Sequence, residues 1–349
     1  MSITRNRIEI LSQLGQEMSL MATKLTDPSY SADPILGPLI AQTTAKNGWF
    51  TPDQIAYCLR HWGELLQPNH LAEWVGDIDF AEITQTTVLI IAAGNIPLVG
   101  FHDILVTYLS GHQCVIKPAT NDQVLTPYFV QRIAELDPKS ASRLIITREL
   151  VGSFDAVIAT GSDNSARYFD HYFGKKPNLI RRNRFSCAVL TGSETQEQLA
   201  LLGDDIFRYF GLGCRSVAAL WVPEGYDFSS FFAGIYSWSE VINHHKYANN
   251  YDYNKAVYMM SNIPLWDNGF LLLKSDSRVG GSPIGTLNYQ TYSSIDEVNQ
   301  SLLLQKDQIQ CVVGPSVLPN ALDFGQTQRP LLHDYADGID PIKFVLSLY

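Results

Sequence analysis

A cysteine in a glycine-rich turn is the residue of this sequence best suited to covalent chemistry. Cys214 stands between Gly213 and Arg215 in the run 210–217, FGLGCRSV. The two glycines of this run let the backbone turn sharply and leave room for a substrate beside the sulfur. A neighbouring arginine favours the thiolate, which is the form of cysteine that attacks carbonyl carbon. Because cysteine is also among the most buried residue types, the turn alone is equally consistent with packing.

The elements around this turn have an alternating pattern. An amphipathic segment over 199–209 precedes the cysteine, and a strand-like run over 217–222 follows it. Upstream, short apolar runs alternate with segments of helical periodicity, which predicts βαβ units and a parallel sheet. The predicted strands cover 88–93, 113–118, 143–147, 156–160 and 187–191, and the helices cover 98–110, 123–136 and a segment from 164.

Polar residues follow three of these predicted strands. Asn95, Lys117 and Ser162 fall at carboxyl ends, where parallel sheets bind their ligands. No GxGxxG motif is present, so the ordinary dinucleotide-binding fingerprint is missing. The Gly161-Ser162 turn ahead of a helix can offer backbone amides to a pyrophosphate, although such a pair more often only caps the helix.

Composition narrows the class of protein. The chain has 349 residues, 46% hydrophobic, and a formal net charge of -10, which argues against a nucleic-acid partner. Five widely spaced cysteines without a CxxC pair exclude a zinc ribbon or a disulfide framework and favour a reducing, cytoplasmic location. The adjacent His244 and His245 point to different faces of any element, so no metal site is expected. The run 87–101 is too short to span a membrane, and 1–21 is not a signal peptide.

The changes of pattern predict four parts of the chain. Residues 1–75 form a helical N-terminal region, and 76–187 form a domain built on the parallel sheet, to which the family resemblance described next assigns the binding of a nicotinamide cofactor. Residues 188–325 form a catalytic domain that carries the thiol. The segment 326–349 is a tail that packs on the body or at a subunit interface.

The order of these pieces resembles the aldehyde dehydrogenase superfamily, and within it the acyl-CoA reductase branch that includes the fatty-acid reductases of bioluminescence. The resemblance covers about 88–216 and, more loosely, 285–301. It implies an α/β fold with a Rossmann-type parallel-sheet cofactor domain and an α/β catalytic domain. It also implies site roles: Cys214 as the nucleophile, Asn95 in the oxyanion hole, Lys117, Ala119 and Thr120 at the adenosine ribose, and Gly161 and Ser162 at the pyrophosphate.

Departures from the superfamily pattern refine this expectation. Hydrolytic members carry a Glu-Leu-Gly-Gly segment whose glutamate activates water, whereas the corresponding residues 182–186 (RNRFS) contain no carboxylate. A thiol acceptor such as CoA then becomes the natural partner of the acyl-enzyme. Thr120 stands where a ribose-binding glutamate is usual, which favours NADPH, with NADH as the alternative. The usual nicotinamide-ribose glutamate has no clear match near 280–285.

The resemblance therefore implies NADPH-dependent reduction of an acyl-CoA thioester to an aldehyde through an acyl-cysteine. Three alternatives stay open: a reductase of an acyl phosphate or acyl adenylate delivered by a partner enzyme, a cysteine acyltransferase or thioesterase, and a catalytically decayed binding subunit. The superfamily also implies a homo-oligomer. Arg181, Arg182 and Arg184 either meet the phosphates of CoA or cofactor, or belong to a solvated basic loop.

Overall fold

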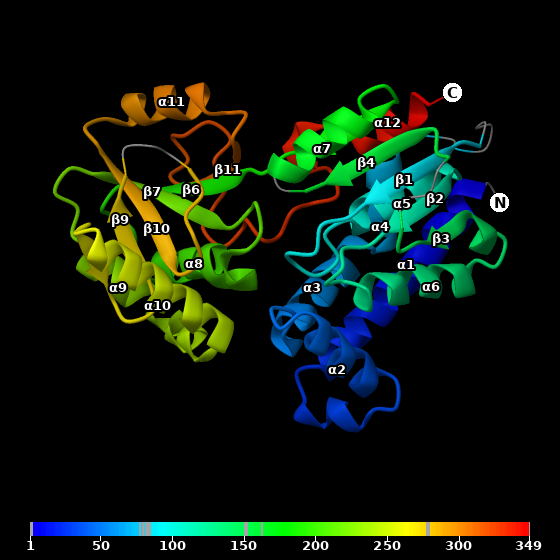
Figure 1. The fold of residues 1–349 in the computed structure, drawn as a ribbon, viewed down its shortest axis with the longest axis horizontal. Helices are drawn as coiled ribbons and strands as arrows, with labels where there is room; N and C mark the ends of the chain where they lie inside the picture. The colour runs from blue at the N-terminus through cyan, green and yellow to red at the C-terminus, as the bar shows by residue number, and fades with distance from the viewer. Residues whose placement is uncertain are drawn as a thin grey trace. The chain divides into compact units, whose positions relative to one another are not determined.

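The computed structural model describes residues 3–76, 78, 80, 85–149, 153–161, 163–276 and 280–348. The chain forms two compact units (Figure 1). Unit 1 contains Met1–Arg182 and Leu331–Tyr349, and unit 2 contains Asn183–Pro330. The boundary predicted from the sequence between cofactor and catalytic domains follows residue 187. The division in the structure lies five residues earlier because strand β6 (Phe185–Val189) pairs within the sheet of unit 2.

Unit 1 is built on a parallel sheet. Its strands are β1 (Thr87–Ile91), β2 (Gln113–Lys117), β3 (Leu144–Ile146), β4 (Ala156–Thr160) and β5 (Asn178–Arg181), in the order β3-β2-β1-β4-β5. The first four lie on the predicted apolar runs, because β-rich runs bounded by turn residues form buried parallel strands. Strand β5 was not predicted from the sequence.

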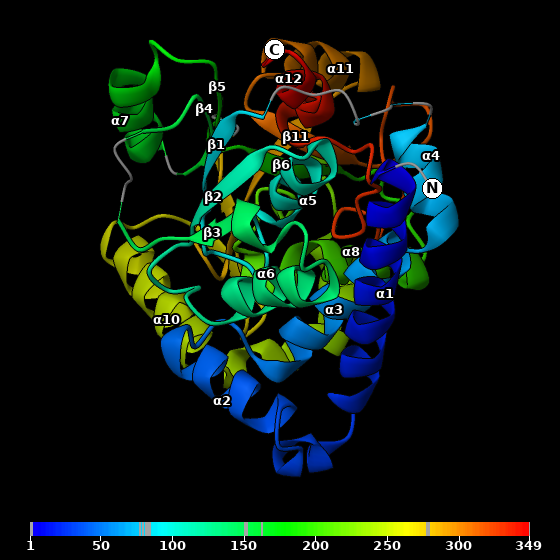
Figure 2. The ribbon, with the colours of Figure 1, turned by 90° about the vertical axis from the view of Figure 1, so that its right-hand side faces the viewer.

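Helices cover both faces of this sheet. Helix α7 (Asp163–Phe173) lies on one face, and α5 (Phe101–Ser110) and α6 (Leu125–Leu136) lie on the other (Figures 1 and 2). Under α7, the ring of Phe173 packs with Leu89, Val115 and Val157. The N-terminal region is helical, as the sequence predicts: α1 (Ile3–Lys24), α2 (Leu36–Lys46), α3 (Pro52–Leu65) and α4 (Pro68–Val75).

Unit 2 has a second, mixed sheet, in the order β11-β6-β7-β10-β9-β8. Beyond β6, its strands are β7 (Val217–Pro223), β8 (Leu265–Asp267), β9 (Leu272–Ser275), β10 (Thr286–Tyr292) and β11 (Ile309–Val313). Among the described strands of this sheet, β8 alone runs antiparallel to its neighbour, β9. Helices α8 (Gln196–Phe207), α9 (Phe228–Gly234) and α10 (His245–Met260) cover one face, and α11 (Ile295–Leu304) covers the other (Figure 1).

The C-terminal segment belongs to unit 1. Helix α12 (Pro341–Leu346) packs against α5. Two histidines hold the segment: the ring of His102 lies 3.0 Å from the carbonyl oxygen of Leu332, and that of His112 lies 3.1 Å from the carbonyl oxygen of Val345. Among the described residues, no helix has both the length and the apolar character that crossing a membrane requires.

Candidate active site

Most of the predicted cofactor residues lie along one edge of the sheet of unit 1. Strand β1 pairs in parallel with both β2 and β4, with Ile91 opposite Lys117 on one side and Ala159 on the other. The carboxyl ends of the three strands therefore meet at the same edge. Lys117 ends β2, and the turns after β1, β2 and β4 carry Asn95, Ala119, Thr120 and Gly161 at this edge. Ser162, the remaining predicted cofactor residue, lies outside the described residues.

The turn after β1 has a fixed shape. The carbonyl oxygen of Gly94 accepts hydrogen bonds from the side-chain amides of Asn121, at 2.9 Å, and Asn47, at 3.1 Å. A Cβ on Gly94 would come within 2.7 Å of the Cβ of Ala119, so this turn and the one after β2 touch only because the residue is glycine. Asn95 is exposed on the turn. The sheet edge therefore presents an amide side chain on an ordered backbone.

This edge fits a nucleotide. In the order β3-β2-β1-β4-β5, the chain leaves β1 toward β2 and later returns to β4 on its other side. Such a switch point opens a crevice at the carboxyl ends of the strands, where doubly wound sheets bind dinucleotides. A Cβ on Gly161 would lie 2.7 Å from the Cβ of Ser165, so glycine is needed where α7 closes against the end of β4.

The turn that carries Cys214 lies in unit 2 and begins with unusual backbone geometry. Tyr209, Phe210 and Gly211, directly after α8, have φ angles of 54°, 57° and 75°. Left-handed conformations cost non-glycine residues about 1–2 kcal/mol each. Packing compensates, since Phe210 is buried and its ring stacks on that of His244, with centroids 4.3 Å apart. The left-handed residues change the direction of the chain after α8, and Cys214, three residues after Gly211, is exposed.

Three side-chain hydrogen bonds hold the turn from outside. Ser186 Oγ donates to the carbonyl oxygen of Cys214 at 2.9 Å. Arg215 donates through Nε to the carbonyl oxygen of Thr327. The amide of Gln328 donates to Ser216 Oγ at 3.2 Å. The sequence predicts that the Arg215 guanidinium favours the thiolate. In the structure, the carbonyl oxygen of Thr327, 112 residues later in the chain, fixes the position of this guanidinium.

The other cysteines have different surroundings. Cys58, Cys114 and Cys187 are buried, and burial raises the pKa of the Cys114 and Cys187 thiols. Cys311 is half-buried, with its sulfur 2.9 Å from Ser186 Oγ. Cys214 is therefore the most accessible of the five thiols, as a nucleophile must be.

The three arginines divide between the two units. Arg181 is buried and forms a bidentate ion pair with Asp103, one of whose bonds measures 2.7 Å. Arg181 is therefore part of a buried ion pair, and this differs from both roles considered from the sequence, phosphate binding and a solvated loop. Arg182 is exposed and pairs with Asp170 at 2.8 Å. Arg184 donates to backbone carbonyl oxygens of the β11 region at 3.3 Å.

The two adjacent histidines have structural contacts. His244 caps α10 and stacks on Phe210, and the ring of His245 stacks on that of His244 with centroids 5.3 Å apart. Within the described part of the chain, no three His, Cys, Asp or Glu residues converge as metal ligands would.

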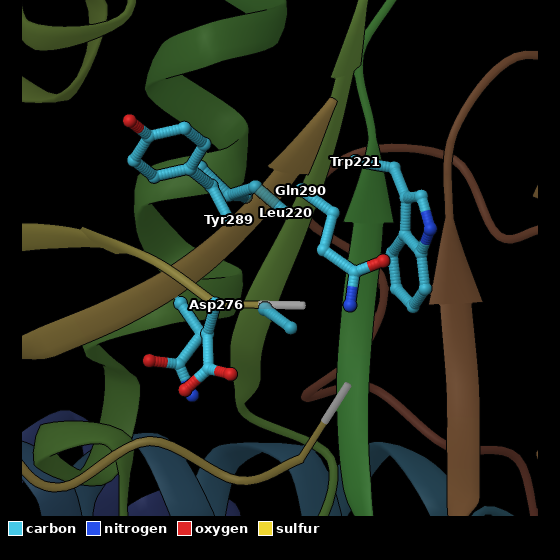
Figure 3. Close-up of a pocket in the computed structure, with 7 residues that line it drawn as sticks. Leu220, Trp221, Asp276, Tyr289 and Gln290 are labelled. Carbon is cyan, nitrogen blue, oxygen red and sulfur yellow. The ribbon is translucent and has the colours of Figure 1, made fainter. Parts of the chain in front are cut away.

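A small pocket lies on the second sheet, and its lining includes no residue of the Cys214 turn (Figure 3). It is a shallow depression lined by residues of β7 and β10 and by Asp276, with Trp221 and Gln290 opposite each other in register. The buried Asn288 Oδ1 and Gln290 Nε2 have no hydrogen-bond partner among the described residues. Its lining contains none of the predicted site residues.

Comparison with solved structures shows the fold. The structure is similar to aldehyde dehydrogenase 21 from Physcomitrella patens, with 13% identity and a TM-score of 0.58 over 86% of this chain and 71% of that chain. It is also similar to an acetylating aldehyde dehydrogenase from Geobacillus thermoglucosidasius, with 13% identity and a TM-score of 0.58 over 90% and 77%. An NAD-dependent aldehyde dehydrogenase from Sinorhizobium meliloti has 13% identity and a TM-score of 0.64 over 95% and 73%. The fold is that of the aldehyde dehydrogenases, as predicted.

Sequence comparison identifies the family. A search of curated proteins gave no match. The model of one family, acyl-CoA reductase (LuxC), matches residues 39–230, which include the turns after β1, β2 and β4 and the Cys214 turn. The match covers more than half of the chain. The chain therefore belongs to the acyl-CoA reductase (LuxC) family and is an oxidoreductase that acts on acyl and aldehyde groups.

Proposed function

We propose that this protein reduces an acyl-CoA thioester to an aldehyde, with NADPH, through an acyl-enzyme on Cys214. The observation that carries the proposal is the Cys214 turn itself: an exposed thiol on a strained backbone, held by Ser186 and Arg215. Structural cysteines are normally buried, whereas reactive ones are accessible and lie beside positive charge.

Acyl transfer needs a nucleophile and a place for negative charge. The Cys214 thiolate attacks the acyl carbon, and the tetrahedral oxyanion collapses as the bond to the CoA sulfur breaks. We assign stabilisation of the oxyanion to the backbone N–H of Cys214 and, on the family resemblance, to the Asn95 side-chain amide. The CoA thiol has an ordinary pKa of about 8.5, so it leaves as thiolate with little help from a general acid.

The fate of the acyl-enzyme depends on what surrounds it. The residues that replace the water-activating segment, 182–186, contain no carboxylate, and one of them, Ser186, contacts the nucleophile turn instead. Without a general base, attack by water is slow and the acyl-cysteine persists. NADPH, when bound, supplies the hydride that reduces this thioester. Cys214 then releases the aldehyde as its sulfur again becomes a thiolate.

The residues assigned to the cofactor are those at the sheet edge of unit 1. Lys117, Ala119, Thr120, Gly161 and Ser162 would hold the adenosine ribose and pyrophosphate. Thr120 is exposed and neutral, so it does not repel a 2′-phosphate. We expect NADPH to give the higher catalytic efficiency and Thr120→Glu to shift the preference toward NADH. A clear NADH preference of the wild type would contradict this assignment.

The decisive experiment follows NADPH oxidation with acyl-CoAs of graded chain length. The wild type should consume NADPH and release CoA and aldehyde. Cys214→Ala should lose this activity, whereas the matched variant Cys311→Ser should keep it. Full activity of Cys214→Ala would overturn the mechanism.

Other products would identify the alternatives. Free acid or a transferred acyl group without NADPH oxidation indicates a thioesterase or acyltransferase. Activity only with acyl phosphate or acyl adenylate indicates a partner enzyme that delivers the acyl group, and no acyl labelling of Cys214 indicates a binding subunit. On the resemblance we also expect a homo-oligomer, in the cytoplasm.

A further inference from the structure

The Cys214 turn depends on contacts from distant parts of unit 2. Within the turn, Leu212 N–H donates to the carbonyl oxygen of Tyr209 at 3.1 Å and Ser216 N–H donates to that of Gly213 at 3.0 Å, but the segment forms no regular helix or strand. An irregular segment of this kind has low local stability unless other elements restrain it. Its geometry therefore depends on its external anchors.

Two of these anchors come from one segment, residues 325–328, which we call the strap. Thr327 accepts the Arg215 Nε–H through its carbonyl oxygen, and Gln328 donates to Ser216 Oγ. The strap is itself neither helix nor strand. It can restrain the turn only if something fixes the strap.

A single buried carboxylate fixes it. Asp205, which is 0% exposed, accepts hydrogen bonds from Gly325 N–H at 2.6 Å, Thr327 N–H at 2.9 Å and Thr327 Oγ–H at 2.7 Å. Gly325 has a φ of +82°, which favours glycine, and a Cβ at this position would lie only 3.1 Å from the side chain of Leu201. The strap thus has the conformation that directs two backbone N–H groups at one carboxylate.

Asp205 connects α8, which precedes the Cys214 turn in the chain, to the strap, which contacts Arg215 and Ser216 after the cysteine. It lies on α8, two residues before the end of the helix that leads directly into the left-handed residues ahead of Cys214. A carboxylate surrounded by neutral donors is costly to bury, and burial raises the pKa of Asp205 to about 6. Hydrogen bonds to an ionised acceptor are about twice as strong as neutral ones, which suits a group that must hold a loop.

We propose that Asp205 is a positioning residue for the nucleophile, acting through the strap on the Cys214 turn. This inference rests on the proposed role of Cys214 in acyl transfer. Asp205, Thr327 and Arg215 then act together, because α8 fixes the strap and the strap fixes the backbone beside the thiol.

Hydrogen exchange of the full-length protein tests the proposal without requiring activity. Asp205→Asn removes the charge at nearly constant volume and should speed amide exchange in both 324–329 and 212–216 by about tenfold or more. Thr327→Val, which removes one of the three donors, should have the same effect to a smaller extent. The control is Asp204→Asn, whose carboxylate pairs with Arg208 instead, and this variant should leave both segments unchanged.

Kinetics supply the second readout. Where the wild type reduces acyl-CoA, Asp205→Asn should lower kcat by about tenfold or more while the KM for NADPH stays within about twofold. Faster exchange confined to 324–329, or spread over all of unit 2, would overturn the proposal, because Asp205 would then be only structural. If the wild type lacks acyl-CoA reduction, the proposed function fails, and the exchange result still decides the role of Asp205.

Discussion

Ser186 Oγ lies 2.9 Å from the carbonyl oxygen of Cys214 and donates a hydrogen bond to it. The same hydroxyl oxygen accepts the Cys311 N–H at 3.2 Å. Ser186 is buried on β6, so one serine connects two neighbouring strands of the second sheet to the backbone of the proposed nucleophile. On the superfamily resemblance this segment would carry a water-activating glutamate, whereas here Ser186 supplies a structural contact to the Cys214 turn.

Replacing Ser186 should therefore affect both stability and turnover. Ser186→Ala leaves the Cys214 carbonyl oxygen and the Cys311 N–H without their partner, which should cost about 1–3 kcal/mol of unfolding free energy. We also expect kcat for acyl-CoA reduction to fall, since the carbonyl group is part of the nucleophile's own backbone. Chemical denaturation and steady-state kinetics measure the two effects. Cys311→Ser, which keeps the Ser186 hydroxyl, is the control, and equal kinetic losses in the two variants would contradict the prediction.

Asn95 should affect turnover without affecting stability. Its side chain is exposed on the turn after β1, so Asn95→Ala should leave the melting temperature nearly unchanged. Loss of one oxyanion donor typically lowers kcat by about 100-fold or more. The affinity for NADPH, measured by fluorescence titration, should stay close to that of the wild type.

Asn121→Ala provides the contrast. Its amide holds the Gly94 carbonyl oxygen at 2.9 Å, so its loss should disturb the shape of the same turn. We expect this variant to lower both turnover and the melting temperature. If Asn95→Ala retains full activity, Asn95 has no part in the oxyanion site.

The sequence predicted the strand ends of unit 1 because their signals are local. Asn95 and Lys117 lie at the ends of short apolar runs, next to Gly94 and Pro118, and parallel strands align such ends without further information. Strand β5 was missed because it has only four residues, two of them polar. Strand β5 forms because it pairs with the backbone of β4 at the edge of the sheet, and this pairing exists only once the sheet has assembled.

The contacts that restrain the turn of the proposed nucleophile, Cys214, were not predictable in the same way. The one local signal for Asp205 is a carboxylate among the apolar residues of an amphipathic helix, near Leu202 and Ile206. Its partners follow about 120 residues later, and nothing in chain order connects them. The turn itself was expected to rely on its glycines, yet Tyr209 and Phe210 adopt left-handed conformations because aromatic packing stabilises them.

The buried pair of Arg181 and Asp103 should be important for stability. The two side chains are 8% and 2% exposed, and the pair joins the end of β5 to α5. Arg181→Met would leave the Asp103 carboxylate buried without its cation, which should cost about 3–5 kcal/mol. Urea denaturation measures this loss, and adding Asp103→Leu should recover part of it.

The neighbouring Arg182 is the matched control. It pairs with Asp170 at the surface, at 2.8 Å, so Arg182→Ala should change stability by about 1 kcal/mol or less. A small effect of Arg181→Met, together with a raised KM for acyl-CoA or NADPH, would instead favour the phosphate-binding role considered from the sequence.

His112 should make the stability of unit 1 depend on pH. Its Nδ1 accepts the Thr86 N–H at 3.2 Å while its Nε2 faces the Val345 carbonyl oxygen, an arrangement that requires the neutral ring. Burial lowers the pKa of His112 below its ordinary value of 6.5. The unfolded chain therefore binds the proton more readily, and stability should be constant above about pH 6.5 and fall below it, by up to about 1.4 kcal/mol per pH unit.

Replacing His112 by a neutral residue separates the effect of its protonation on stability from the contribution of its packing. His112→Gln should lower stability at pH 8 and flatten its decline between pH 7 and pH 5, because the titrating group is gone. As a control for the substitution itself, replacing the exposed His70 by Gln should leave the stability at pH 8 nearly unchanged. Buried His102, whose pKa is also lowered by burial, contributes in the same direction, so part of the slope should survive in His112→Gln. Denaturation midpoints of the wild type and of His112→Gln at pH 7 and pH 5 measure the two slopes. An unchanged slope in the variant would mean that His112 does not couple protonation to folding.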